Sequence, residues 1–172
     1  MLRHLTKTFL LILLLVEGVI NIGYAETKVG LETFKIDPET NIELTSQSMT
    51  FDNQKGQADF FDDVVVEYGR LKLFAQKLSF IKSKSTKELN HFTFSASGKI
   101  KISDGSNIIY GDSADFNSKK NELIIRGNVR LNQNNNIING EKLILNLQKG
   151  IARISGSVKT VISPTGKTND SQ

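Results

Sequence analysis

A short motif recurs at a fixed spacing in this chain and constrains the fold more than any other feature. Gly98, Gly127 and Gly156 each begin a Gly-x-Ile or Gly-x-Val triplet, and each follows the previous one by 29 residues. A second signal lies 13 residues into each unit, at Gly111 and Gly140. Self-similarity at this period is typical of repeat architectures, in which stacked units bury a continuous core that one unit cannot bury alone.

The same frame extends towards the N-terminus, with one insertion. Asp62 stands where the triplet glycine stands in later units, Ala75 follows it by 13 residues, and Ser46 precedes Ala75 by 29. The interval from Asp62 to Gly98 is 36 residues rather than 29. The polar, lysine-rich stretch 82–88 lies inside this interval, so we predict that the extra residues form an exposed turn there.

Apolar and polar residues alternate with a period of two from residue 42 onwards. Apolar side chains occupy every second position around each triplet glycine, and mostly polar residues such as Lys99, Lys101 and Asn128 lie between them. This pattern predicts β-strands with one buried and one solvated face. Turn sequences rich in Asn, Asp and Gly separate the strands. Residues 26–38 are predicted to form an extended entry segment, and no helix is predicted after the leader.

The triplet glycines lie inside the strand patterns rather than in the turns between them. A glycine within a strand marks a bulge or a bend, and its recurrence in register predicts that every layer bends at the same place. The predicted fold class is therefore all-β: a folded-over, taco-like jellyroll of stacked strands in repeats of about 29 residues. Its inner face would be one long apolar trough.

Residues 1–25 have the composition of a cleavable signal peptide. Arg3 and Lys7 precede a short apolar run over 9–16, and a small-x-small sequence ending at Ala25 marks a cleavage site. The run is shorter than the roughly 20 apolar residues that a spanning helix needs; an uncleaved anchor is the alternative. We therefore predict that the protein is exported. The predicted division of the chain is a cleaved signal peptide over 1–25, one β-jellyroll domain over 26–162 and a flexible polar tail over 163–172.

Composition excludes several kinds of functional site. The chain has no cysteine, which excludes disulfides, cysteine-ligated zinc and a thiol nucleophile. Outside the leader His91 is the only histidine, which leaves little for a histidine-based triad or metal centre. The net charge is +4 and no basic run occurs outside 82–87, which argues against a nucleic-acid partner. We expect no cofactor, no metal and no nucleic acid.

Acidic residues offer two possible sites, and we interpret both as structural. Asp59, Asp62 and Asp63 form a cluster, and paired carboxylates can perform glycoside chemistry, but a solvated strand end explains them more simply. Asp112 and Glu141 recur at one repeat position, which favours acceptance of backbone N–H bonds at a turn over catalysis. The protein is expected not to be an enzyme. A β-solenoid that binds or cleaves surface polysaccharide is the alternative class.

The pattern over residues 42–162 resembles the OstA-like family, and within it the periplasmic bridge proteins of lipopolysaccharide transport. The resemblance is carried by Asp63-Val-Val-Val66, Ala75-Gln-Lys-Leu-Ser-Phe80, Gly111-Asp-Ser-Ala-Asp-Phe116, Ile125-Arg-Gly-Asn-Val129 and Ile138-Asn-Gly-Glu-Lys-Leu143. It implies a periplasmic protein with an open, V-shaped jellyroll of stacked antiparallel strands, which binds lipopolysaccharide through its lipid A part. The chain departs from the pattern at Asp62 and Ser46, where other units have Gly or Ala.

The resemblance also implies partners. These are related jellyroll domains of an inner-membrane-anchored protein and of an outer-membrane barrel assembly, together with further copies in a head-to-tail homo-oligomer. The inner-membrane-anchored member of the same transport system is the alternative within the family. Unpaired strands at the two ends of an open sheet are templates for strand addition. The residues predicted for these docking edges are Ile42, Leu44, Ile154 and Val158.

The inner face of the bent sheet is the predicted lipid-binding trough. Burying one CH₂ group contributes about 0.8 kcal/mol, so a fully enclosed chain of about 12 carbons would gain on the order of 10 kcal/mol. An open groove that encloses chains only in part can release them again. The inward residues predicted to line the trough are Phe51, Val64, Val66, Leu78, Phe80, Phe94, Ile100, Ile102, Phe116, Ile125, Val129 and Leu131.

Overall fold

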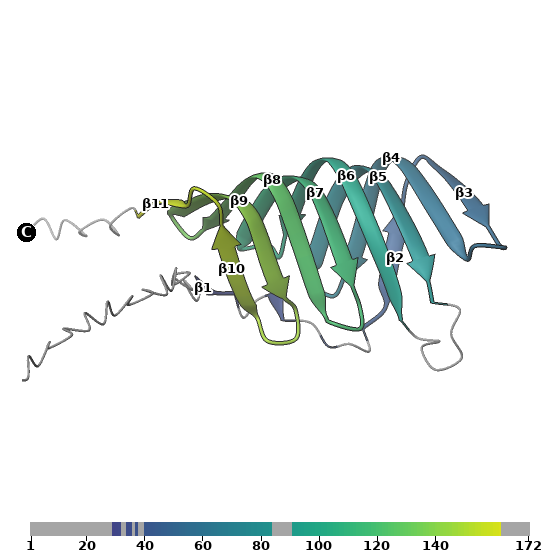
Figure 1. Ribbon diagram of the computed structural model, residues 1–172, viewed down its shortest axis with the longest axis horizontal. Helices are drawn as coiled ribbons and strands as arrows, with labels where there is room; N and C mark the ends of the chain where they lie inside the picture. The colour runs from purple at the N-terminus through teal and green to yellow at the C-terminus, as the bar shows by residue number, and fades with distance from the viewer. Residues whose placement is uncertain (1–28, 32–33, 36, 38–39, 84–90, 163–172) are drawn as a thin grey trace, which may run out of the picture.

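A computed structural model describes residues 29–31, 34–35, 37, 40–83 and 91–162. These residues form one antiparallel sheet of 11 strands, shown in Figure 1. The predicted signal peptide, the polar tail and most of the predicted turn over 82–88 lie outside the described residues. The strands are β1 (Val29–Gly30), β2 (Ile42–Thr45), β3 (Ser48–Asp52), β4 (Gln57–Tyr68), β5 (Leu71–Lys82), β6 (Phe92–Ser103), β7 (Asn107–Asn117), β8 (Glu122–Gln133), β9 (Asn136–Asn146), β10 (Ile151–Ser155) and β11 (Lys159–Val161).

Strand order in the sheet follows strand order in the chain over most of its length. From β4 to β10 each strand pairs antiparallel with the next, as short connections between consecutive strands require. Both β2 and β3 pair with β4 at one end of the stack. At the other end β11 pairs with β9 and β1 pairs with β10. The sheet stays open, and the predicted all-β stack of antiparallel strands is confirmed.

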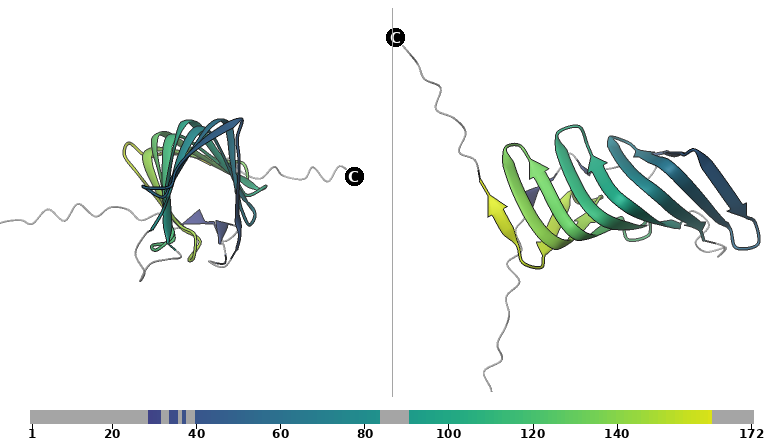
Figure 2. Two further views of the ribbon diagram at one scale, coloured as in Figure 1. Left: turned by 90° about the vertical axis from the view of Figure 1, so that its right-hand side faces the viewer. Right: turned by 90° about the horizontal axis from the view of Figure 1, so that it is seen from above.

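The long strands bend at the repeated motif. Neighbouring strands shift register at a bulge that includes Gly98 and Lys99 in β6, and at another that includes Gly127 and Asn128 in β8. Both residues of each pair have a positive φ, for example 86° at Gly98 and 55° at Lys99. Bulges bend a strand and increase its twist. Because the bends lie side by side, the strands trace an arch when seen along the stack (Figure 2, left).

The first unit makes the same bend without a glycine. Asp62 and Asp63 have φ values of 59° and 48°, and β4 shifts register between Phe61 and Val64. Aspartate tolerates the left-handed region better than most residues with a side chain. The prediction that this acidic cluster lies at a strand end is therefore wrong, because the pair forms the bend in the middle of β4.

The second glycine of each unit allows a close approach between strands. A Cβ atom on Gly140 would lie 2.5 Å from Ile154 Cγ2, and one on Gly111 would overlap the side chain of Ile125. Each glycine thus leaves room for an inward isoleucine of a neighbouring strand. Among the described residues no helix has the length and hydropathy needed to cross a membrane.

Candidate functional site

The inner face of the arch consists of apolar side chains aligned in rows across the strands. Cross-strand pairing gives one row of Phe51, Ala58, Phe80, Phe94, Phe116, Leu123, Leu145 and Ala152. It gives a second row of Met49, Phe60, Leu78, Ala96, Ala114, Ile125, Leu143 and Ile154. Beyond the bend a third row contains Leu44, Val66, Leu73, Ile102, Ile109, Leu131 and Ile138.

The 12 residues predicted to line a trough all lie in these rows or at the bends between them. Ten are buried, including Val64, Ile100 and Val129 at the bends. Phe80 is half-buried, and Phe51 in the terminal strand β3 is 63% exposed. Along the first row, exposure decreases to 7% at Phe94 and 0% at Leu145. The apolar face is therefore accessible at the β3 end of the stack and covered towards β10.

Aromatic rings cluster on the part of the inner face that is nearer to β3. Phe116 lies 5.2 Å from Phe94, 5.5 Å from Phe92 and 6.1 Å from Tyr68, measured between ring centroids. Phe92 in turn stacks on Phe80 at 5.2 Å. Such ring pairs contribute about 0.5–1.5 kcal/mol each beyond their buried area. Since Phe80 and Phe92 are only half-buried, the cluster has an accessible margin.

Apolar side chains pack closely between the legs of the arch. One cavity there measures about 20 Å³ and is lined by nine residues, from Val66 on β4 to Leu147 after β9, and this is room for roughly one water molecule. Leu31 and Phe34 are 0% exposed and belong to the same core as the inner rows. Sequence reasoning placed both in an extended entry segment and missed their burial. The available signal was the apolar content of this segment, which has Val29, Leu31, Phe34 and Ile36 within residues 26–38.

The two ends of the stack differ in how far their strands are paired. Ile42 and Leu44 of β2 are half-buried and pair with β4, and the opposite side of β2 has no partner in the described sheet. Ile154 is half-buried in β10, whereas Val158 is 50% exposed between β10 and β11. The expectation of an unpaired edge at β10 is wrong in part, because β1 pairs with Ile151 and Ala152.

Exposed apolar side chains gather at these ends. Of the seven large apolar residues that are exposed in the described part of the chain, Met49 and Phe51 lie in β3, while Val158, Val161 and Ile162 lie in or beside β11. Exposed apolar surface at the ends of an open sheet is typical of an interaction surface. The terminal strands therefore carry both unpaired backbone and apolar contacts.

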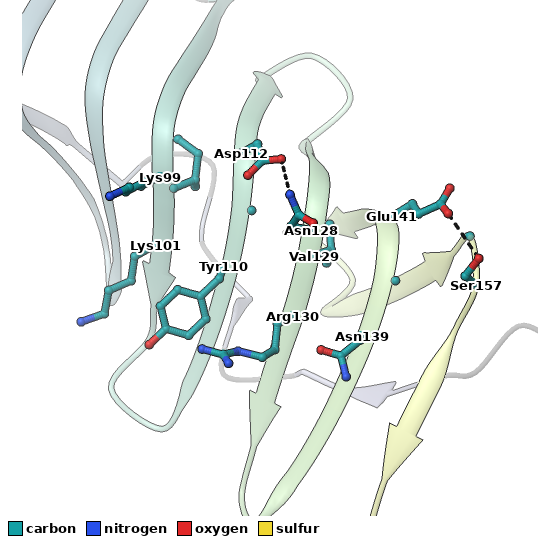
Figure 3. Close-up of a pocket in the computed structure, with 14 residues that line it drawn as sticks. Lys99, Lys101, Tyr110, Asp112, Asn128, Val129, Arg130, Asn139, Glu141 and Ser157 are labelled. Atoms are coloured by element: carbon teal, nitrogen blue, oxygen red, sulfur yellow. Dashed lines mark hydrogen bonds between the residues drawn. The ribbon is translucent and has the colours of Figure 1, made fainter.

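A hollow with a mixed polar and apolar lining lies on the outer side of the bends and is shown in Figure 3. It measures about 690 Å³. Arg130 stacks over Tyr110 at 4.7 Å, and Lys101 lies 5.5 Å from the centroid of the Phe74 ring. The hollow has both positive and negative side chains, and it lies behind the backbone that separates it from the inner rows. It is larger than this inner cavity, and its lining is mixed: Ile100, Val129 and the Tyr110 ring lie beside charged side chains.

The acidic residues of this outer region support the strands. Asp112 Oδ2 accepts a hydrogen bond from Asn128 Nδ2 at 2.8 Å, and Glu141 Oε1 accepts one from Ser157 Oγ at 3.3 Å. The donors that the structure gives them are thus side chains of the next bend, rather than the predicted backbone N–H groups. Asp59 bonds to Gln57 Nε2 at 2.9 Å. Hydrogen bonds from Ser79 and Gln57 lower the pKa of Asp59. This carboxylate is therefore ionised and held by neighbouring side chains.

The described residues contain no group of histidine, cysteine and acidic side chains placed to hold a metal ion.

Residues 43–151 match the family described as LptA/(LptD N-terminal domain) LPS transport protein. The chain belongs to this family. The match runs from β2 to the start of β10 and so contains all of the long strands. The OstA-like resemblance seen in the sequence is confirmed.

Comparison with solved structures agrees with this assignment at the level of fold. The chain is similar to LptH from Pseudomonas aeruginosa, described as the LptA homologous periplasmic component of the conserved lipopolysaccharide transport device. The TM-score is 0.65 at 20% identity, over 74% of this chain and 99% of LptH. The comparison with curated protein sequences gives no significant match. The protein is thus a lipopolysaccharide transport protein of the LptA family, a family of transport proteins rather than enzymes.

Proposed function

We propose that this protein shields the acyl chains of lipopolysaccharide between the two legs of its bent sheet during transport through the periplasm. The observation that carries the proposal is the inner face itself. Its first two rows are apolar through eight strands, from β3 to β10, and no charged side chain interrupts them. An acyl chain lying along such a row meets only hydrocarbon, which is the condition for the full transfer free energy of about 0.8 kcal/mol per CH₂ group.

Entry of the lipid is expected at the β3 end. Phe51 is exposed there, and the half-buried rings of Phe80 and Phe92 continue its apolar surface towards the interior. Aromatic side chains move as rigid units with few rotamers, so they can rearrange around an acyl chain at a low entropic cost. Partial exposure at this margin limits the binding free energy, and a lipid held in this way can be passed on.

The terminal strands are proposed to join the protein to related domains. Strand addition to β2 and β3 would satisfy their unpaired backbone groups, while Met49 and Phe51 would supply apolar contacts. At the opposite end Val161 and Ile162 offer a similar surface. Edge-to-edge docking in this head-to-tail manner would align successive troughs. A series of such domains would bridge an inner-membrane-anchored partner and an outer-membrane assembly.

A photo-crosslinking experiment tests the lipid assignment. A photoreactive amino acid replaces Phe80 or Phe94, two inward residues paired across β5 and β6. The control position is Lys101, which lies on the outer face of β6 and is exposed. After irradiation with purified lipopolysaccharide, we expect a lipid-shifted band for the inward positions alone. Equal labelling at Lys101, or no labelling at Phe80 and Phe94 in a protein that melts cooperatively, would contradict the proposal.

A further inference from the structure

We propose that Leu31 and Phe34 are an internal occupant of the trough, which an acyl chain must displace, and that the same displacement frees the edge of β10. This inference rests on the proposed lipid-binding function and adds a mode of regulation to it. Val29, Gly30, Leu31 and Phe34 are called the strap here. The backbone of the first two pairs with β10, and the side chains of the last two lie in the core.

Burial supports the role of Leu31 and Phe34 as occupants. Both side chains are 0% exposed, although neither belongs to one of the long strands that form the arch. They lie in one apolar core with inner-row residues such as Leu145, and the cavity that lies among Val66, Phe94 and Leu147 measures about 20 Å³. Space of that size does not admit a hydrocarbon chain. Leu31 and Phe34 therefore cover the surface that the acyl chains need.

The strap reaches the trough from outside the repeated units. Its backbone is held at the β10 end through only two residue pairs, Val29 with Ala152 and Gly30 with Ile151. Farther along the chain, Asp37 lies near enough to Tyr68 on β4 for its negative charge to contribute to the raised pKa of that tyrosine. Described residues of the N-terminal segment thus lie near both the β10 end and the β4 end, and the purple strands β1 and β2 lie on the open side of the arch in Figure 2.

Displacement of the strap has two consequences that are thermodynamically linked. An acyl chain replaces apolar contacts of the same kind as those of Leu31 and Phe34, so the exchange conserves buried apolar surface. The apparent lipid affinity is reduced by the fraction of molecules in which the strap is bound. When the strap leaves, Ile151 and Ala152 lose their partners, and the edge of β10 becomes available for strand addition. Lipid binding and docking at β10 then favour each other.

A reversible crosslink tests whether the strap must move. The chain has no cysteine, so the double variant Val29→Cys/Ala152→Cys introduces one defined pair. Directly paired residues on antiparallel strands have Cα atoms about 4.5–5.5 Å apart, which suits a disulfide. The matched control is Glu67→Cys/Lys72→Cys, because this pair joins β4 to β5 on the outer face. Both proteins are exported as the full chain and carry the photoreactive residue at Phe94.

The oxidised strap variant is expected to capture lipopolysaccharide at least tenfold less than its reduced form, while oxidation of the control pair changes nothing. Equal capture by the oxidised and reduced strap variants would overturn the inference and leave the lipid-binding function intact. Loss of capture in both redox forms of both variants would instead contradict the lipid-binding function, and the inference with it.

A substitution that weakens the strap, rather than fixing it in place, also tests whether the strap competes with lipid. Leu31→Ala/Phe34→Ala weakens the internal occupant without altering any long strand. We expect about a tenfold rise in capture at limiting lipopolysaccharide, because the competing occupant is lost. Unchanged or reduced capture in the strap variant, at a melting temperature above the assay temperature, would overturn the inference.

Discussion

The carboxylate of Asp112 lies against the backbone of Gly127 so closely that a Cβ atom on the glycine would overlap it. The same carboxylate accepts a hydrogen bond from Asn128, the second residue of the bend. Glu141 and Gly156 repeat this relationship one unit later, where the added Cβ would lie 2.6 Å from Glu141 Oε2. The triplet glycine and the acidic residue of the second repeated motif therefore contact each other across neighbouring strands. This contact shapes the arch.

Replacement of the bend glycine should destabilise the fold. Gly127→Ala introduces both the overlap with Asp112 and a side chain at a φ of 75°, and we expect the free energy of unfolding to decrease by about 2–3 kcal/mol. Gly105→Ala is the control, because Gly105 has a φ of 95° but no atom within 4 Å of the added Cβ. Denaturant melts should show a clearly smaller loss for Gly105→Ala; equal losses would mean that the Asp112 contact is unimportant.

Substitutions of Asp62 test whether the first bend needs a carboxylate or only a residue that tolerates a positive φ. Asp62 has a φ of 59°, so Asp62→Gly should keep the fold and the lipid capture. Asp62→Val places a β-branched side chain in the left-handed region and should cost about 1–2 kcal/mol. Thermal melts of the two variants measure this difference. A variant Asp62→Gly that folds normally but loses capture would point to a functional role for the carboxylate.

Alanine substitutions of inner-face aromatic residues should lower the free energy of unfolding much more at a buried position than at an exposed one. Phe116 is 3% exposed and contacts three aromatic rings, so Phe116→Ala should lower the free energy of unfolding by about 3–5 kcal/mol. Phe51→Ala removes a ring that is 63% exposed, and the expected change is within about 0.5 kcal/mol. Urea titration of both variants is the measurement. Similar losses at the two positions would show that Phe51 is packed in solution.

Tyr68 should make the fold sensitive to alkaline pH. Its burial, and secondarily the charge of Asp37, raise its pKa above the ordinary value of 10.0. A raised pKa means that the folded state favours the neutral phenol. The contribution of Tyr68 to the free energy of unfolding is therefore complete below pH 10.0 and is lost as the pH rises through the raised pKa. Unfolding of the wild type should therefore become easier above about pH 10, and Tyr68→Phe should flatten this decrease. Parallel slopes for the two proteins would contradict the assignment.

Self-association should depend on the exposed residues at the β3 end. Phe51→Asp places a charge on the apolar surface beside the free edge of β3, and we expect the association constant to fall at least tenfold because a desolvated charge opposes the contact. Thr93→Asp adds the same charge at an exposed position within β6. Sedimentation at several concentrations measures the effect. Equal weakening by both substitutions would mean that net charge, rather than the β3 surface, controls association.

Local sequence determined most of the architecture, because its signals act between neighbours in the chain. Period-two alternation assigns the inner and outer faces of a strand such as β6 without reference to any distant residue. Glycines at 98, 127 and 156 lower the cost of a left-handed bend at each site. Each of the long strands β4 to β9 continues through its bend. Even the 12 inward residues could be assigned in this way, although what fills the space between them could not.

Tertiary structure decided how the trough is occupied and how its edges are paired. Leu31 and Phe34 lie outside the repeat, so no periodicity predicts that they pack against β-strands more than 100 residues later in the chain, such as β9. The pairing of Val29 with Ala152 likewise joins segments from opposite ends of the fold. Such contacts depend on the closure of a long loop, and the arch must already exist before they can form. The sequence alone therefore predicted an open groove, and only the fold placed Leu31 and Phe34 in the core with the inward rows.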